Sequence, residues 1–526
     1  MRGWDFAVSI DPQASLPIFA QIARAIAGDI RRGRLRAGEP MPGTRRLART
    51  LGVNRNTVIA AYDDLAAEGW VTTENGRGTF VSRTLPDPRP RRFAAVTGAT
   101  PTGDVEPFDL GPGIHVERCP SSLSTTYNLA GWPDLRLVPT KAIARAWRRS
   151  IEGRTRQVLS YGPAGGHPRL RAALASMLSA TRGLAIDESR LLVTRGTQGA
   201  LAVIAHGVLR PDDVVAMENP GYQRARQVFA LVGARVVPVP VDAHGLCTDH
   251  LAALVREQPI RAVFVTPHHQ FPTTVTLSPA RRLRLLELAR EHRFVIIEDD
   301  YDHEFHYDGR PILPLASADS AGNVIYIGSL SKTLAPGLRL GYIAASERVI
   351  AHLTECSSLL DTHGDQVLES AVAELLEDGE VQRHVRRVRR VYHARRDAMA
   401  ALLANELGDA MSLTLPAGGT AMWVRVMSDV DLQQWSQLAA AEGVLFETGD
   451  RFFFDGQTAP YVRLGFAGYR EAELTDAVQR LAKTMAAARG AKRRRVVGQT
   501  GIEPLRLRTL RCDIDHEFLS PGIGER

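Results

Sequence analysis

Apolar residues near the start of the chain follow a helical period. Between residues 14 and 32 they recur every four positions, at Ile18, Ile22, Ile26 and Ile30. This spacing predicts an amphipathic helix. A Gly- and Pro-rich turn follows, and we expect a second, shorter helix that is capped by Thr44 and ends at Gly52. Asn54 is then placed to cap a third helix.

The pattern changes to short strands after the third predicted helix. Residues 70–73 and 78–81 are rich in β-branched and aromatic side chains, and the Asn75-Gly76 pair between them favours a tight hairpin. Two helices joined by a Gly-containing turn form a helix-turn-helix unit. The hairpin that follows it is expected to form a wing.

A second region begins after a linker rich in Pro, Thr, Gly and Arg. Its apolar runs lie at residues 191–193, 214–217, 236–239, 262–265, 294–297 and 324–327. Helical stretches separate these runs, which predicts an α/β fold with a mainly parallel sheet. Further helical and strand-like segments from about residue 369 predict a smaller C-terminal α/β portion. The expected domains are a winged helix-turn-helix (1–83), a flexible linker (84–107), the large domain (108–489) and a basic, disordered tail (490–526).

Composition narrows the possible classes of protein. The 526 residues are 44% hydrophobic and 23% charged, as in globular proteins. No apolar run reaches the ~20 residues that span a bilayer, and the first residues do not resemble a signal segment. We therefore expect a cytoplasmic protein without membrane contact. The four cysteines are scattered, so neither a disulfide framework nor a metal site is expected.

Basic charge is concentrated at the two ends of the chain. The net charge is +7, and the first 92 residues carry 15 basic against 9 acidic side chains. An uneven charge distribution of this kind is typical of a protein that binds a polyanion through one end of its chain. Asn56 and Thr57 fall on the first turn of the third helix, the part that reaches base edges in most helix-turn-helix units. These features predict binding to double-stranded DNA; a bundle for protein contact is the alternative.

Residues 14–82 resemble the winged-helix domain of the GntR family of bacterial transcription regulators. The matching stretches are Pro42 with Arg45 to Ala48, Leu51 to Val58, Tyr62 to Gly69 and Gly76 to Val81. The resemblance implies DNA contacts from Arg45, Arg55 and Thr57, with the wing at Asn75 and Gly76. Ile59 stands where some members of the family have another DNA-contacting arginine, so no operator sequence is implied.

Two segments of the large domain concentrate polar side chains after apolar runs. Glu298, Asp299, Asp300 and Tyr301 follow one run, and residues 328–341, with Lys332 and Arg339, follow another. Ligands of open α/β sheets bind beyond the carboxyl ends of strands. A lysine among small hydroxyl residues, near an arginine, suits an amine nucleophile beside an anion site. Pyridoxal 5′-phosphate (PLP) needs such a lysine, an acid for its ring nitrogen and donors for its phosphate.

Residues 110–480 are similar to fold-type I aminotransferases, and the combination with the N-terminal domain resembles the MocR subfamily of GntR regulators. The resemblance implies that Lys332 forms an aldimine with PLP, that Asp299 pairs with the ring nitrogen and that Tyr301 contacts the ring hydroxyl. The other implied cofactor contacts are Tyr222 on the ring and Ser329, Arg339, Gly196, Thr197 and Gln198 at the phosphate. Arg463, with Arg224 as a second contact, would receive the carboxylate of a substrate or effector.

The sequence departs from classical aminotransferases where these have Asn-Pro-Thr-Gly. Here Phe271 to Thr274 follow His268-His269-Gln270, so His269 or Gln270 is a candidate replacement for the asparagine. Glu298 competes with Asp299 for the ring nitrogen, because strand neighbours point to opposite faces. His303 and His306 are interpreted as surface or packing residues.

We interpret the chain as a PLP-dependent transcription regulator whose aminotransferase-like domain senses PLP or an amino compound. The alternatives are a working aminotransferase with a DNA-binding head and a regulator whose large domain only dimerises. The residues that bind an amine also permit its turnover, so enzyme activity stays open. The MocR resemblance implies a head-to-tail homodimer.

Overall fold

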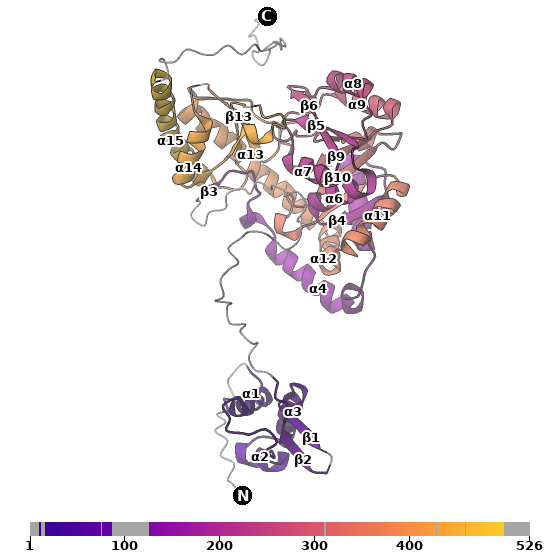
Figure 1. The fold of residues 1–526 in the computed structure, drawn as a ribbon, viewed down its shortest axis with the longest axis vertical. Helices are drawn as coiled ribbons and strands as arrows, with labels where there is room; N and C mark the ends of the chain where they lie inside the picture. The colour runs from indigo at the N-terminus through magenta and orange to yellow at the C-terminus, as the bar shows by residue number, and fades with distance from the viewer. Residues whose placement is uncertain are drawn as a thin grey trace, which may run out of the picture. The chain divides into compact units, whose positions relative to one another are not determined.

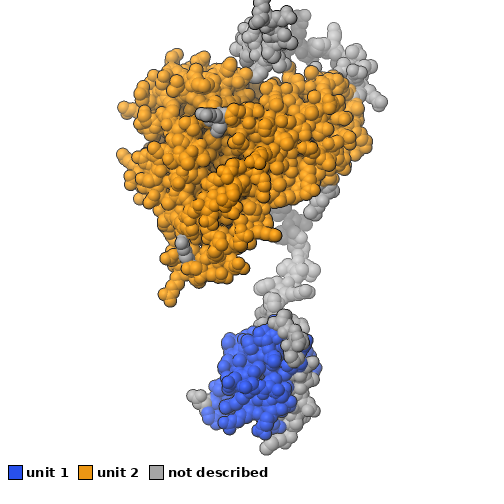
Figure 2. All heavy atoms as spheres, turned by 180° about the vertical axis from the view of Figure 1, so that it is seen from behind, with its two compact units in different colours: residues 1–113 blue, residues 114–526 orange. Residues whose placement is uncertain are grey.

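The computed structural model describes residues 10–11, 16–74, 76–86, 126–309, 312–427, 429–457 and 459–498. The chain divides into two compact units, residues 1–113 and 114–526, which Figure 2 shows in blue and orange. No helix among the described residues is long and apolar enough to cross a membrane. The linker expected at 84–107 lies outside the described residues, except for positions 84–86.

Unit 1 contains the three predicted helices and the wing. Its elements are α1 (Ile18–Arg31), α2 (Thr44–Leu51), α3 (Arg55–Ala67), β1 (Val71–Glu74) and β2 (Gly78–Val81). β1 and β2 pair antiparallel, and the helices bury the apolar face predicted for them, including Ile22, Ile26 and Ile30. The Tyr62 hydroxyl of α3 donates to the Pro42 carbonyl at 2.8 Å, which ties α3 to the turn before α2.

The helix boundaries in unit 1 differ from the prediction at two places. α1 begins at Ile18, after Pro17, and not at Ala14. Thr44 is the first residue of α2 and Gly43 precedes it as N-cap, so the prediction that Thr44 caps this helix is wrong. Gly52 ends α2 with φ 64°, a left-handed conformation that glycine adopts without strain. The Asn54 side chain accepts from the Asn56 amide at 2.8 Å, which confirms the predicted cap of α3.

Unit 2 is built on an eight-stranded sheet in the order β4-β11-β10-β9-β8-β5-β6-β7. Its strands are β4 (Leu191–Thr194), β5 (Val214–Asn219), β6 (Arg235–Asp242), β7 (Gly245–Leu246), β8 (Ala262–Val265), β9 (Val295–Asp300), β10 (Val324–Ser329) and β11 (Gly341–Ala344). β11 is antiparallel to both of its neighbours and β7 is antiparallel to β6, whereas the strands from β10 to β6 are parallel.

Helices cover both faces of this sheet (Figure 1). One face packs against α6 (Gly196–Val208), α7 (Gln223–Leu231) and α11 (Glu347–Asp361). The other face packs against α4 (Thr140–Val158), α5 (Pro168–Arg182), α8 (Thr248–Glu257), α9 (Pro279–His292), α10 (Leu315–Ala318) and α12 (Gln366–Glu377). Alternate residues of β9 enter the two cores, Ile297 on the α6 face and Ile296 on the α9 face. Most strands of the sheet are therefore buried on both faces, with β6 as a partly exposed exception, which explains their continuous apolar runs.

A smaller α/β portion follows, as predicted. It contains β12 (Met411–Leu413), β13 (Ala421–Val426), β15 (Glu447–Thr448) and β16 (Tyr461–Gly465), with α13 (Glu380–Leu407), α14 (Leu432–Ala441) and α15 (Glu471–Gly498). β3 (Tyr127–Asn128) joins it by pairing with β14 (Val444–Leu445). The 3-10 helices are η1 (Leu135–Leu137), η2 (Glu188–Arg190), η3 (His303–Phe305), η4 (Pro336–Leu338) and η5 (Gly449–Phe452). α15 ends at Gly498, beyond the boundary expected at residue 489; residues 499–526 lie outside the described part of the chain.

Candidate cofactor and DNA-binding sites

The register of β9 separates its two competing carboxylates. Glu298 points to the α9 and α10 face, where it accepts from the backbone amides of Leu315 at 2.7 Å and Ala316 at 2.9 Å. Asp299 shares the opposite face with Ile297, and that face also carries Tyr222. The structure thus gives Glu298 a structural role at the first turn of α10 and leaves Asp299 on the side of the predicted cofactor residues.

Asp299 is a buried carboxyl group whose charged form is unfavourable. It is 3% exposed, and its Oδ1 atom has no hydrogen-bond partner among the described residues. Burial, followed by repulsion from Asp300, Asp302 and Glu218, raises the pKa of Asp299 well above its usual value. A buried acid without a partner is costly. The position is suited to a cationic or proton-bearing ligand group.

Lys332 lies just after β10, at the carboxyl end of the sheet. Its Nζ donates to the Gly131 carbonyl at 3.0 Å. Burial, followed by the positive charge of Arg463, lowers the pKa of Lys332 to about 8. The neutral amine, which a nucleophilic lysine requires, therefore becomes the major form above about pH 8, well below the pH at which an ordinary lysine loses its proton.

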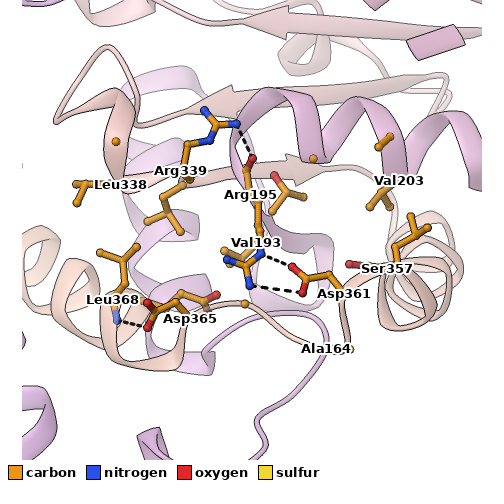
Figure 3. Close-up of a pocket in the computed structure, with 18 of the residues that line it drawn as sticks. Ala164, Val193, Arg195, Val203, Leu338, Arg339, Ser357, Asp361, Asp365 and Leu368 are labelled. Carbon is orange, nitrogen blue, oxygen red and sulfur yellow. Dashed lines mark hydrogen bonds and ion pairs between the residues drawn. The ribbon is translucent and has the colours of Figure 1, made fainter. Parts of the chain in front are cut away.

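The predicted phosphate residues gather at the start of α6. Gly196 begins this helix with φ 67°, and a Cβ at this position would lie 3.0 Å from the Arg339 guanidinium. Arg339 donates to the Arg195 carbonyl at 3.0 Å, as Figure 3 shows. Free backbone amides and the helix dipole at such an end favour an anion. The Ser329 side chain accepts from the Ser331 amide at 3.1 Å, within the turn that carries Lys332.

Tyr222 is held next to the same helix. Gln198 donates to its hydroxyl at 3.1 Å, and its ring meets Phe271 edge-on at 5.2 Å. Burial, followed by the carboxylate of Asp299, raises the pKa of Tyr222 to about 12. Tyr222 therefore stays a neutral ring beside Asp299. Arg224 is exposed on α7, and Thr197 lies on the first turn of α6.

Arg463 of β16 comes from the smaller portion and is 4% exposed. It donates to the Ala130 carbonyl at 2.8 Å, and its guanidinium lies 4.8 Å from the centre of the Phe271 ring. Its Nε atom has no hydrogen-bond partner among the described residues. Its positive charge also acts on Tyr301, whose hydroxyl donates to the His269 carbonyl at 3.1 Å. The two portions of unit 2 thus bring Lys332 and Arg463 to one place.

The segment after β8 contains two histidines, His268 and His269, followed by Gln270, which has a structural role. Gln270 donates to Glu218 at 3.3 Å and to the Pro220 carbonyl at 2.9 Å, so it is occupied in holding the end of β5. His269 contacts Asp302 at 2.8 Å. His303 and His306 are only 4% and 8% exposed. They are therefore packing residues, and the interpretation as surface residues is wrong. Sequence reasoning did not identify Glu218 or Asp302, which no motif marks.

A cavity of about 460 Å³ opens beside Arg339. Figure 3 shows Arg195 reaching across it to Asp361 of α11, while Asp365 caps α12 through the Leu368 amide. Lys332, Asp299 and Tyr222 do not line this cavity. The cavity therefore lies beside the Arg339 end of the predicted cofactor site and does not contain the residues predicted to bind the ring and the attaching amine.

The predicted DNA-contacting residues of unit 1 belong to α2, the start of α3 and the wing turn. Arg45, Arg55 and Asn56 are exposed and Thr57 is half-buried. The Arg55 Nε approaches the Thr44 hydroxyl at 3.4 Å, which brings α2 and the start of α3 together. Gly76 has φ 77° in the wing turn, and Asn75 lies outside the described residues.

Comparisons with known proteins match both units. Residues 19–81 match the bacterial regulatory proteins of the gntR family, and residues 133–481 match aminotransferase class I and II. The chain is 32% identical over 463 residues to the probable rhizopine catabolism regulatory protein MocR of Rhizobium meliloti, covering 87% of this chain and 92% of that protein. It is 31% identical to the transcriptional regulator TauR of Rhodobacter capsulatus, over 88% and 96% of the two chains.

Solved structures agree with these matches. LysN, an alpha-aminoadipate aminotransferase of Thermus thermophilus complexed with N-(5′-phosphopyridoxyl)-L-leucine, has a TM-score of 0.66 at 28% identity, covering 70% of this chain and 94% of that one. A multiple substrate aminotransferase of Thermococcus profundus also has a TM-score of 0.66, at 29% identity over 71% and 93% of the chains. The predicted fold class and family resemblance are confirmed. The chain belongs to the aminotransferase class I and II family and, through its gntR-family N-terminal domain, to the MocR-type transcription regulators.

Proposed function

We propose that this regulator binds PLP at Lys332 and that occupancy of this site by PLP or an amino compound controls DNA binding by unit 1. The observation that carries the proposal concerns Asp299, whose buried Oδ1 has no hydrogen-bond partner among the described residues and which lies on the same sheet face as Tyr222. The chain also has a buried lysine, Lys332, whose pKa is lowered to about 8. A protonated pyridine nitrogen is the ligand group that such a carboxylate accommodates.

The residues present fit this cofactor. Lys332 would provide the attaching amine, Asp299 would hold the ring nitrogen, Tyr301 would contact the ring hydroxyl and Tyr222 would cover the ring. Ser329, Arg339 and the start of α6 at Gly196, Thr197 and Gln198 would hold the phosphate. The backbone at Gly196 lies close to the Arg339 guanidinium, and an anion held by both groups is supported by this proximity and by the start of α6. When bound, PLP supplies covalent capture of amines and a sink for electrons.

We further propose that the effector is PLP itself or an amine with a carboxylate. Arg463 is buried and offers an Nε donor without a partner among the described residues, so it suits a carboxylate. The exposed Arg224 is a weaker candidate for the same role. We expect a homodimer to bind operator DNA, because unit 1 presents one recognition helix and paired half-sites need two.

The experiment is to purify the chain and add PLP to the wild type and to Lys332→Ala. Borohydride should leave a phosphopyridoxyl mass on Lys332 of the wild type alone. Asp299→Asn should weaken retention of PLP, and Glu298→Gln, on the opposite face, serves as its matched control. A Lys332→Ala protein that takes up PLP with the same reducible mass on another lysine would contradict the assignment.

A further inference from the structure

Four histidines gather behind the turn that carries Tyr301. His268 and His269 follow β8, whereas His303 belongs to η3 and His306 follows it. All four are buried, between 1% and 8% exposed. The proposed cofactor site uses none of their side chains. A buried imidazole is normally held by hydrogen bonds, so this cluster requires a physical reason.

The ring nitrogens of three of these histidines converge. The nearest ring nitrogens of His268, His269 and His306 lie within 4.8 Å of one another. His269 Nε2 and His306 Nδ1 are 3.3 Å apart. Two nitrogens bound tetrahedrally to zinc, at 2.0–2.1 Å from the metal, are separated by about 3.3 Å. The spacing of this pair, which also allows a hydrogen bond between the two rings, therefore matches that of two zinc ligands.

The surrounding groups orient the rings as the neighbours of a metal site do. Asp302 Oδ1 lies 2.8 Å from His269 Nδ1, so a proton on Nδ1 leaves Nε2 with a free lone pair toward His306. The other Asp302 oxygen has no hydrogen-bond partner among the described residues. Gly418 covers His269, and a Cβ there would lie 2.2 Å from Nε2. The Gly418 backbone therefore packs closely against this ring, and a larger residue there would collide with it.

His268 is the strongest indication of a missing partner. Neither of its ring nitrogens has a hydrogen-bond partner among the described residues, although the side chain is 4% exposed. His303 stacks on it with ring centroids 4.4 Å apart, and His303 Nδ1 lies 3.0 Å from Asp300. Leaving a buried polar group unpaired is energetically unfavourable. A metal ion would satisfy the His268 nitrogen that faces the cluster and remove part of this cost.

We propose that His268, His269 and His306 bind a divalent transition-metal ion, with zinc as the best fit. Three imidazoles suit zinc and neighbouring transition metals, whereas Ca²⁺ and Mg²⁺ prefer oxygen ligands. Asp302 is a positioning residue that orients His269. The site adjoins the cofactor residues through the Tyr301 hydroxyl, which donates to the His269 carbonyl. It does not depend on the proposed function, because metal binding can be measured without PLP or DNA.

The test uses the full chain without a polyhistidine tag, stripped with a chelator and titrated with Zn²⁺ and with Co²⁺. We expect one zinc per chain by elemental analysis and a visible Co²⁺ spectrum of four-coordinate type that Zn²⁺ abolishes. His268→Gln and His306→Gln should each remove stoichiometric binding. Asp302→Asn should weaken it about 10–100-fold. His250→Gln, an exposed histidine on α8, is the matched control and should bind as the wild type does.

Substoichiometric zinc in the wild type would overturn the proposal, as would equal affinity in His268→Gln and His250→Gln. If the two ligand variants do not fold, the wild type still decides the question. Zn²⁺ should raise its melting temperature and give the four-coordinate Co²⁺ spectrum. If the wild type shows neither response, the histidines do not bind a metal and are packing residues only.

Discussion

Lys332 and Arg463 donate to consecutive backbone carbonyls, Lys332 to Gly131 at 3.0 Å and Arg463 to Ala130 at 2.8 Å. The two cations come from different portions of unit 2 and meet on one short segment. Their like charges explain why Arg463 contributes to the lowered pKa of Lys332. Reactivity at Lys332 is therefore linked to the residue proposed to receive a carboxylate.

The first prediction concerns pH. Because the neutral amine is the nucleophile and the pKa of Lys332 is lowered to about 8, capture of PLP should accelerate as pH rises through about 8 and then level off. Arg463→Gln removes a positive charge, so the midpoint should move to higher pH. The measurement is the borohydride-trapped fraction of Lys332 against time at each pH. Arg425→Gln, an exposed arginine on β13, should leave the midpoint unchanged; an identical shift in both variants would count against this linkage.

A second prediction addresses the carboxylate of the effector. Wild-type protein loaded with PLP should bind alanine more tightly than ethylamine, which lacks the carboxylate. Arg463→Ala should remove most of this preference, because a charge-assisted hydrogen bond of about 1.5–3 kcal/mol is lost. Spectral titration with both amines gives the ratio directly. Persistence of the full preference in Arg463→Ala would move the carboxylate contact elsewhere, with Arg224→Ala as the next variant.

The third prediction concerns DNA. A duplex selected in vitro from random sequences should bind with a log-log salt slope of about −0.9 per phosphate neutralised. Arg55→Ala and Thr57→Ala should each weaken specific binding by about 1–3 kcal/mol if they read bases. Arg24→Ala, exposed on α1, is the control. Equal losses on selected and random duplexes would reduce Arg55 and Thr57 to positioning contacts.

A fourth prediction concerns stability. Asp134 is 4% exposed and accepts from Arg136 Nε at 2.7 Å and Arg395 Nη2 at 2.9 Å. Burial alone would raise the pKa of Asp134, but these hydrogen bonds outweigh it and lower the pKa below 3.8. Its stabilisation is therefore present above about pH 4 and is lost as pH falls through the folded pKa.

Asp134→Asn should lower the free energy of unfolding by about 3 kcal/mol near pH 7, since it leaves buried arginine charge uncompensated. Urea unfolding of unit 2 measures this change. The exposed Glu355→Gln variant should remain within about 0.5 kcal/mol of the wild type. If Asp134→Asn lowers the free energy of unfolding no more than the control does, water must solvate the Arg395 charge in place of Asp134, and the prediction is wrong.

Periodicity and turn residues predicted the three helices and the hairpin of unit 1. The isoleucine spacing, Asn54 and Gly52 all act within one element or turn, so their effect is local. The same reasoning misplaced the cap at Thr44, because a threonine can either cap a helix or begin it. Six strands of the large sheet, β4, β5, β6, β8, β9 and β10, were predicted from their apolar runs, whereas β7 and β11 were not. Most of these six runs are buried on both faces, and β6 is the partly exposed exception.

The site was less predictable where contacts are long-range. Glu298 and Asp299 could not be separated by pattern, since β9 is buried on both faces; the amides of α10 decide the register. Ala130 and Gly131 carry no motif, yet they accept from Lys332 and Arg463. The histidine cluster joins two segments that follow different strands, so no local motif in the sequence marks it.

The central claim is that the ligand site of unit 2 controls DNA binding by unit 1. The most direct measurement is operator affinity with and without PLP, and with PLP plus an amino acid, in the wild type and in Lys332→Ala. A coupling of about 1–3 kcal/mol corresponds to a 5–150-fold change, and DNA must change ligand affinity by the same factor. The account predicts such a change in the wild type and none in Lys332→Ala. Wild-type affinity that neither PLP nor any bound amine alters would contradict it.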